Sequence, residues 1–159
     1  KRTLGLTLLL FATLFSCMRQ EKPLPAELSR AESVMWEHPD SALSILRSMP
    51  QSSFQAERTN ATWALLLAQA DKVYGKRLPD SLNIPSSDKL VQDAMDYFEK
   101  EDDLKRMAQA YYYKGQLLED QKKLTEAIPL FLKSKDIMTR LDEPLFTYLT
   151  ANHLRENDL

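Results

Sequence analysis

The chain has few of the residues that build catalytic and metal sites. Its 159 residues include three glycines, two histidines and one cysteine. Gly5, Gly75 and Gly115 are too far apart in sequence to form a phosphate-binding loop. His38 and His153 have no Cys, Asp or Glu at the spacing of metal ligands, and no serine lies in a nucleophile-elbow sequence. We therefore expect no catalytic residue, no metal site and no cofactor, and interpret the protein as a non-enzyme.

The charge balance argues against binding to nucleic acid. The chain carries 21 basic and 23 acidic residues, and loss of Lys1 and Arg2 with a leader peptide would leave a net charge of −4. Direct binding to nucleic acid calls for a basic face, so we expect no nucleic-acid partner. The acidic run 99–103 lacks the glycine and the spaced oxygens of a calcium loop, and we interpret it as a solvated turn.

The N-terminus has the pattern of an export signal. Two basic residues precede the uncharged apolar run 4–15, which is short for a membrane span and suits a signal peptide. The sequence Leu-Phe-Ser-Cys at 14–17 resembles a bacterial lipobox, with an apolar residue at −3 and a small one at −1. The resemblance implies cleavage before Cys17 and attachment of acyl chains, palmitate among them, to that residue. The alternatives are an ordinary secreted protein with an incidental cysteine and an uncleaved N-terminal anchor.

These features divide the chain into three parts. Residues 1–16 are the predicted lipoprotein signal peptide, residues 17–25 a lipidated tether, and residues 26–159 a helical domain. Pro23 and Pro25 make the tether semi-rigid. The residue after the cysteine is Met18 and not aspartate, and by the usual sorting rule of lipoproteins this favours the outer membrane. The resemblance therefore implies a cell-envelope location, lipid-anchored at the outer membrane and facing the periplasm.

Strong helix formers and helical periodicity dominate the domain, which predicts an all-α fold. Asp102 or Asp103, Thr125 and Asp142 are the predicted N-caps of the later helices, and Pro129 then lies within a first helical turn. The expected helices fall into the pairs 26–49, 55–100 and 103–140, followed by a final helix over 142–159. Their bounds are 26–36, 41–49, 55–74, 88–100, 104–120 and 124–140.

The segment 108–141 has the most distinctive spacing. With Ala108 as position 1, Tyr111 falls at position 4, Gly115 at 8, Ala127 at 20 and Phe131 at 24. This spacing resembles a tetratricopeptide repeat (TPR), a 34-residue helix–turn–helix unit whose helices cross at the small residues. The earlier pairs repeat positions 20 and 24, as Ala42 with Leu46 and Ala94 with Phe98. The resemblance implies antiparallel helix pairs stacked as a right-handed TPR superhelix, with about three repeats and one extra helix.

Members of the TPR family bind partners on a concave groove lined by positions 2, 5, 9 and 12 of the first helix of each repeat. Here the resemblance places Gln109, Tyr112, Gln116 and Glu119 there, with Phe146 from the last helix; Glu143, Thr150 and His153 are the other groove positions of that helix. Amides and carboxylates can pair with peptide groups while aromatic rings cover apolar side chains. The competing interpretation is a solvated helix face without a partner.

The chain resembles TPR lipoproteins of Gram-negative envelopes, which implies a membrane-anchored scaffold that binds a protein or peptide. Two alternatives stay open: the N-terminal sensor part of a longer TPR regulator, and an accessory lipoprotein of an outer-membrane assembly or glycan-uptake complex. The final helix has an apolar face without a second helix to cover it. It could be a cap, be covered by another chain or belong to a longer protein, and we favour the last. The oligomeric state stays open.

Overall fold

The computed structural model describes residues 23–49, 54, 56–74 and 86–156. The predicted signal peptide, Cys17 and Gly75 lie outside these residues. The secondary structure of the described part is entirely helical, which confirms the all-α class. The helices are α2 (Ala26–Val34), α3 (Pro39–Ser48), α4 (Glu57–Tyr74), α5 (Ser87–Glu101), α6 (Leu104–Asp120), α7 (Leu124–Arg140) and α8 (Pro144–Glu156).

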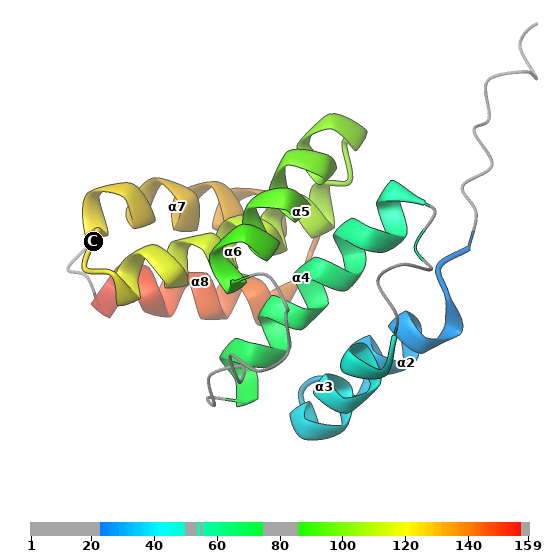
Figure 1. Ribbon diagram of the computed structural model, residues 1–159. Helices are drawn as coiled ribbons and strands as arrows, with labels where there is room; N and C mark the ends of the chain where they lie inside the picture. Colours follow the sequence, from blue (N-terminus) through cyan, green and yellow to red (C-terminus); the bar gives the residue numbers. More distant parts are fainter. Residues whose placement is uncertain (1–22, 50–53, 55, 75–85, 157–159) are drawn as a thin grey trace, which may run out of the picture.

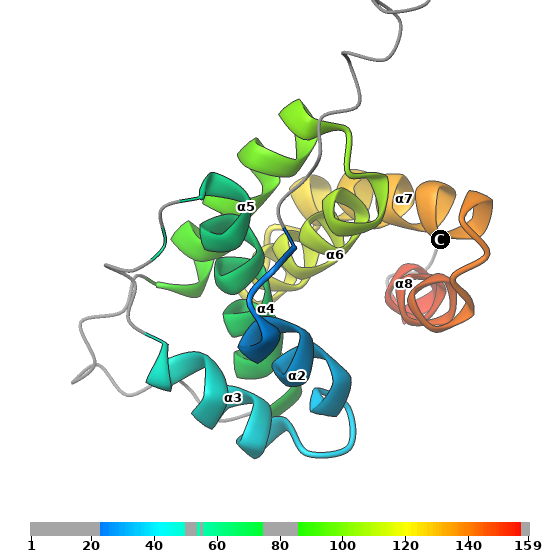
Figure 2. The same ribbon diagram turned by 90° about the vertical axis from the view of Figure 1, so that its right-hand side faces the viewer.

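Each helix packs against the next one along the chain, so the fold is a stack of neighbouring helices (Figure 1). Helix α4 also contacts α2 and α6. Seen along the stack, α2, α4, α6 and α8 lie on the inner side of an arc, and α3, α5 and α7 lie on its outer side (Figure 2). The helices that carry the predicted binding positions are therefore on the same side of the molecule.

Helix α4 is the centre of the hydrophobic core. Its residues 61–70 are all buried, including Thr62 and Gln69, because α2, α3, α5 and α6 surround it. A helix enclosed on every side is expected to be apolar all round, and Ala and Leu dominate this stretch. Trp63 fixes the preceding pair by donating its Nε1–H to the carbonyl of Leu46 at 2.9 Å.

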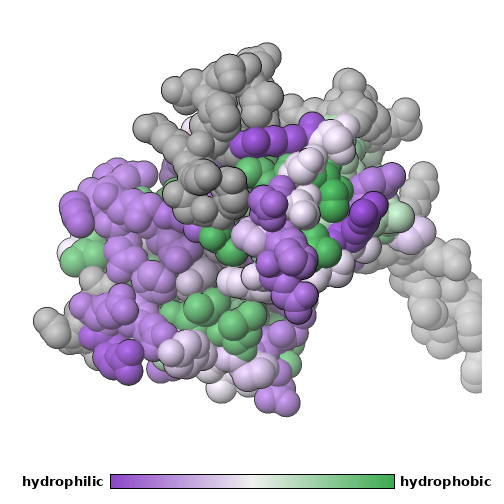
Figure 3. Space-filling view, turned by 90° about the horizontal axis from the view of Figure 1, so that it is seen from below, coloured by the Kyte–Doolittle hydropathy of each residue, from purple (hydrophilic) through white to green (hydrophobic). Residues whose placement is uncertain are grey.

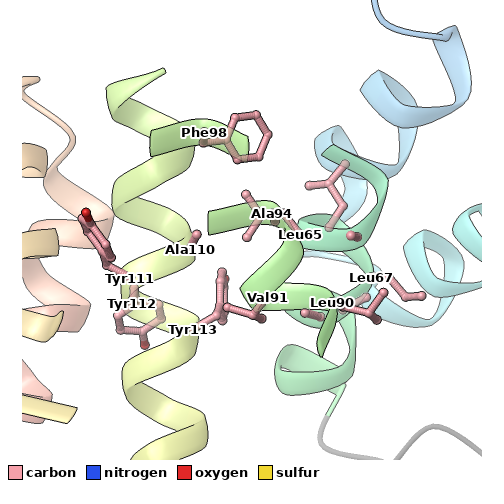
Figure 4. Close-up of a cluster of buried hydrophobic side chains, with 14 of the residues drawn as sticks. Leu65, Leu67, Leu90, Val91, Ala94, Phe98, Ala110, Tyr111, Tyr112 and Tyr113 are labelled. Carbon is pink, nitrogen blue, oxygen red and sulfur yellow. The ribbon is translucent and has the colours of Figure 1, made fainter. Parts of the chain in front are cut away.

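The core continues through α5 into α6 (Figure 4). Three consecutive tyrosines, Tyr111, Tyr112 and Tyr113, are all buried, and they leave α6 in different directions. Tyr113 points toward Val91 of α5, whereas Tyr111 lies on another side of α6 and donates its hydroxyl to Glu99 Oε1 at 2.7 Å. This divergence follows from the 100° rotation between successive helical residues, so the triplet forms no single stacking platform.

The three turns between α5 and α8 share one backbone feature, a residue in the left-handed conformation. Asp102, Lys122 and Asp142, spaced twenty residues apart, adopt the left-handed conformation with φ of 57°, 64° and 54°. In the second turn the Lys123 N–H donates to the Leu118 carbonyl at 2.9 Å, and in the third Glu143 donates to Met138 in the same way. These are the bonds of a Schellman C-cap, which satisfies the last carbonyls of a helix while reversing the chain.

Two predicted N-caps are wrong, and one is confirmed. Asp103 caps α6 by accepting the Arg106 N–H at 3.2 Å, as expected. Asp142 is the left-handed residue of the preceding turn, because α8 begins only at Pro144. Thr125 lies inside α7, whose N-cap is Lys123, so Pro129 sits two residues further into the helix than predicted. The missing N–H of Pro129 therefore removes a regular hydrogen bond within α7.

Helices α6 and α7 approach each other at Gly115, as the sequence predicts. A Cβ atom added to Gly115 would lie 2.6 Å from Cε1 and 2.9 Å from Cδ1 of the Phe131 ring. Phe131 and Ala127 are both fully buried at this crossing. The absence of a side chain at position 115 is what allows the ring to lie so close to the α6 backbone.

Candidate functional site

The predicted groove residues lie together on the side of α6 that faces α8, but they are not all accessible. Gln109, Tyr112 and Phe146 are only 5%, 3% and 5% exposed. Gln116 and Glu119 are half-buried. The structure therefore differs from the expectation of a fully open groove, because α8 covers the middle of this face and leaves only its edge accessible.

Helix α8 covers this face because of the way its residues are distributed around it. Phe146, Thr150 and Leu154, spaced four residues apart, are buried, whereas Leu145 and Tyr148 are exposed. Thr150 can be buried because its hydroxyl donates to the Phe146 carbonyl at 2.7 Å. The side of α8 predicted to line a groove is thus its packing face.

Aromatic rings form the floor of the site. The Tyr112 ring lies edge-on to Phe146 with centroids 5.6 Å apart, and it is 6.0 Å from Phe131. Phe146 also meets Trp36, which comes from the turn after α2, with the centroids 6.2 Å apart. Edge-to-face pairs at these separations each stabilise packing by about 0.5–1.5 kcal/mol beyond area burial. Through Trp36, the first helices contact the last one across the inner side of the arc.

A polar network lies beside these rings and joins α6 to α8. Glu119 Oε2 is 2.8 Å from His153 Nδ1, and His153 Nε2 is 3.3 Å from the Tyr112 hydroxyl. Gln116 Nε2 donates to the same hydroxyl at 3.1 Å. Because a carboxylate can only accept, the tautomer with its proton on Nδ1 suits the position of Glu119 and leaves Nε2 as an acceptor for the Tyr112 hydroxyl.

The His153 ring is also held by stacking. It lies parallel to the Phe131 ring, with an interplanar angle of 10° and centroids 4.9 Å apart. The ring that fills the space beside Gly115 on one side thus supports His153 on the other. This stacking fixes the imidazole plane, and Glu119 fixes its rotation, so the network has a defined geometry.

The burial of Tyr112 determines its part in the network. Burial, and secondarily the nearby Glu119 carboxylate, raise the pKa of Tyr112 to about 12. Burial and the Glu99 carboxylate likewise raise the pKa of Tyr111 to about 12. Tyr112 therefore keeps its proton near neutral pH and can donate it to His153 Nε2. A buried hydroxyl with a raised pKa is a poor nucleophile, which favours a positioning role for this carboxylate–imidazole–hydroxyl sequence.

The raised pKa predicts a loss of stability at high pH. A tyrosine that ionises at about 12 when folded and near 10 when unfolded stabilises the fold fully below pH 10 and loses this contribution as the pH rises toward 12. Each such tyrosine contributes a slope of at most about 1.4 kcal/mol per pH unit. Urea titrations of the wild type and Tyr112→Phe at pH 9 to 11.5 should show a shallower decline for the variant. Equal slopes would contradict the assignment.

An ion pair lies at the N-terminal end of the same side of α6. Arg106 Nη2 donates to Glu32 Oε2 of α2 at 2.9 Å, and the arginine side chain is mostly buried. The sequence analysis did not identify Glu32, Arg106 or Trp36 as part of this face. Their positions depend on how strongly the arc curves, which no local pattern encodes. His153 was placed at a groove position, but its pairing with Glu119 was not predicted.

In comparisons with known proteins, no family model, no curated protein and no solved structure matches the chain. Within the described residues, no three His, Cys, Asp or Glu side chains come together in a way that could hold a metal ion. The helices of that same part include none with the length and apolar character needed to cross a membrane.

Proposed function

We propose that this protein is a TPR-like interaction scaffold that binds a peptide segment of a partner protein on the inner side of its helical arc. Two features support a right-handed TPR superhelix. Consecutive helices pack as neighbours, and α6 and α7 cross at Gly115 and Ala127. A partner would bind along the accessible edge of the face between α6 and α8.

The half-buried polar edge beside the aromatic floor is the observation that carries this proposal. Gln116, Glu119 and His153 keep part of their surface accessible while the network holds them in place. Trp36 adds an aromatic side chain that is 43% exposed at the other end of Phe146. Fixed amide and carboxylate groups pair with peptide N–H and C=O groups, and an exposed indole can cover an apolar side chain.

Site-specific photocrosslinking tests this function. Benzoylphenylalanine in place of Trp36 replaces one exposed aromatic group by another on the inner side. The matched control places it at Leu132, an exposed apolar position on α7, an outer helix. Irradiation of cells that produce each variant should yield a discrete protein adduct from position 36 and none from position 132. The same adducts from both positions, or none from position 36, would contradict binding on the inner side.

We further propose that the scaffold is held at a membrane through acyl chains on Cys17, as the lipobox resemblance implies. Buried acyl methylenes contribute about 0.8 kcal/mol each, so two or more chains retain a folded domain at a bilayer. Labelling with a palmitate analogue should mark the wild type, whereas Cys17→Ala should show only background labelling and should lose membrane retention. Equal labelling of the two proteins would refute the anchor.

A further inference from the structure

A hollow lies between α4 and α5, which pack against each other as consecutive helices (Figure 1). Its volume is about 530 Å³, within the range of about 300–1,000 Å³ that is usual for ligand pockets. Its described lining residues all belong to these two helices, whereas the residues that carry the proposed function belong to α6, α8 and the turn after α2. The hollow is therefore a separate candidate site.

The floor of the hollow is apolar and consists of buried side chains. Ala61, Trp63 and Ala64 of α4 and Leu90 of α5 line it, and all four are buried. The two alanines lie three residues apart on one side of α4, and their short side chains leave space between the helices. A floor of this kind can pack against the methylene groups of a long ligand side chain.

Two aromatic rings at the hollow are held by contacts of their own. Trp63 donates its Nε1–H to the Leu46 carbonyl, and its ring packs against Phe54 with the centroids 5.7 Å apart. Tyr97 is half-buried, and its ring lies edge-on to Phe98 with the centroids 5.2 Å apart. Because these contacts fix both rings in place, the hollow is a permanent feature of the fold and not a gap that a ring turns in to fill.

The rim of the hollow carries mostly negative charge. Glu57 of α4 and Asp93, Asp96 and Glu101 of α5 are exposed there, and among the lining residues that the structure describes Lys100 is the only basic one. Four acidic residues and one basic residue give this rim a charge of −3, whereas the whole chain has −2. The rim thus differs from the face seen from below, where apolar residues gather in a patch bordered by hydrophilic ones (Figure 3). Charge complementarity favours a cationic ligand in the hollow.

Two of these carboxylates contact neighbours on their own helix. Lys89 Nζ is 2.6 Å from Asp93 Oδ2, and Gln92 Nε2 donates to Asp96 Oδ1 at 2.8 Å. Each contact joins residues four positions apart on α5, so it holds a carboxylate at the rim without drawing it across to α4. Exposed pairs of this kind contribute little to stability, because water already solvates both groups. A ligand cation can therefore replace Lys89 and Gln92 as the partner of these oxygens.

We propose that the hollow between α4 and α5 is a second peptide-binding site, which takes an arginine side chain of a partner protein. The methylene groups of the arginine lie on the apolar floor, and its guanidinium group lies at the rim among Glu57, Asp93 and Asp96. A guanidinium is planar with five N–H donors, so it can pair with several carboxylate oxygens at once and stack on a ring such as that of Tyr97. A lysine ammonium is more strongly hydrated and lacks this shape.

An NMR titration of the 159-residue chain tests this site. The probes are the capped peptide Gly-Ser-Arg-Leu-Ser-Gly and the same peptide with citrulline, a neutral isostere, in place of arginine. The arginine peptide should shift the amide signals of 57–64 and 90–101 in a saturable way, with a Kd below about 1 mM. The citrulline peptide should bind at least about 10-fold more weakly, because it keeps the shape of the side chain but lacks its charge.

A pair of double variants separates this site from general charge attraction. Asp93→Asn with Asp96→Asn should weaken binding of the arginine peptide by at least about 10-fold. Glu126→Gln with Asp136→Asn is the matched control, because it removes two carboxylates from the exposed surface of α7, and it should leave the Kd within about twofold of the wild type. Circular dichroism confirms that both variants are folded.

Three results would overturn the proposal. They are an arginine peptide that causes no saturable shifts in α4 and α5, a citrulline peptide that binds as tightly, and an equal loss of affinity in the control variant. Shifts confined to α6 and α8 would place the peptide on the inner side of the arc, which would support the proposed function and overturn this second site.

Discussion

Replacing Gly115 with alanine should destabilise the protein by about 2–3 kcal/mol, although alanine is the better helix former by about 1 kcal/mol. The added Cβ would lie 2.6 Å from Cε1 of Phe131, far inside normal contact distance. The ring has no free space to move into, because it is fully buried and stacked on His153. Leucine at the same position would force α6 and α7 apart and should cost more than about 4 kcal/mol.

Urea denaturation followed by circular dichroism measures this effect. Ser134→Ala is the matched control, because Ser134 is fully buried on α7 and its hydroxyl has no hydrogen-bond partner within the described residues. Removing that hydroxyl should be neutral or stabilising. In a Phe131→Leu background the cost of Gly115→Ala should shrink by at least about 1 kcal/mol, because the two sites are in contact. A midpoint unchanged by Gly115→Leu would show that the helices do not cross there.

Truncating Phe146 should have the second large effect. Phe146→Ala should cost about 3–5 kcal/mol, because the ring is buried and contacts Trp36, Tyr112 and Tyr113 at once. Its loss removes the main apolar contact between α8 and α6 and leaves the His153 network as their principal link. The first helices should also loosen, since Trp36 would lose the ring it packs against.

Hydrogen exchange distinguishes this outcome from a general loss of stability. In Phe146→Ala, the amides of α8 (Pro144–Glu156) should exchange much faster than in the wild type, while those of α4 keep most of their protection. Leu132→Ala truncates a side chain that is 50% exposed and should cost less than about 0.5 kcal/mol. Uniform acceleration across all helices, or an effect no larger than that of Leu132→Ala, would argue against the role assigned to Phe146.

The sequence was most informative where local signals decide the structure. The expected bounds of α6 and α7 match the structure, because Asp103 provides a side-chain cap and two tight turns fall between strongly periodic segments. The close approach at Gly115 was also predictable, because the repeat spacing calls for a small residue where the two helices cross. The failure at Asp142 has a local cause as well. A left-handed turn residue and an N-cap favour the same amino acids, so composition does not separate the two.

The candidate site was less predictable, because it depends on contacts between distant segments. The repeat pattern located Tyr112, Gln116, Glu119 and Phe146 on one side of the molecule, but it did not indicate that α8 would bury Tyr112. That burial follows from α8 turning Phe146 and Thr150 inward, which brings His153 to Glu119 across 34 residues. The contact of Trp36 with Phe146 joins residues 110 positions apart, and it arises from the curvature of the whole arc.

The affinity of a peptide ligand for matched variants tests the central claim most directly. Peptides selected from a random library on the purified wild type would be titrated by calorimetry against Gln116→Ala, on the inner side, and Lys135→Ala, on the exposed surface of α7. We predict that Gln116→Ala weakens binding by at least about 10-fold, equal to about 1.4 kcal/mol, and that Lys135→Ala leaves it unchanged. Ligands that bind both variants as tightly as the wild type would contradict a partner site on the inner side of the arc.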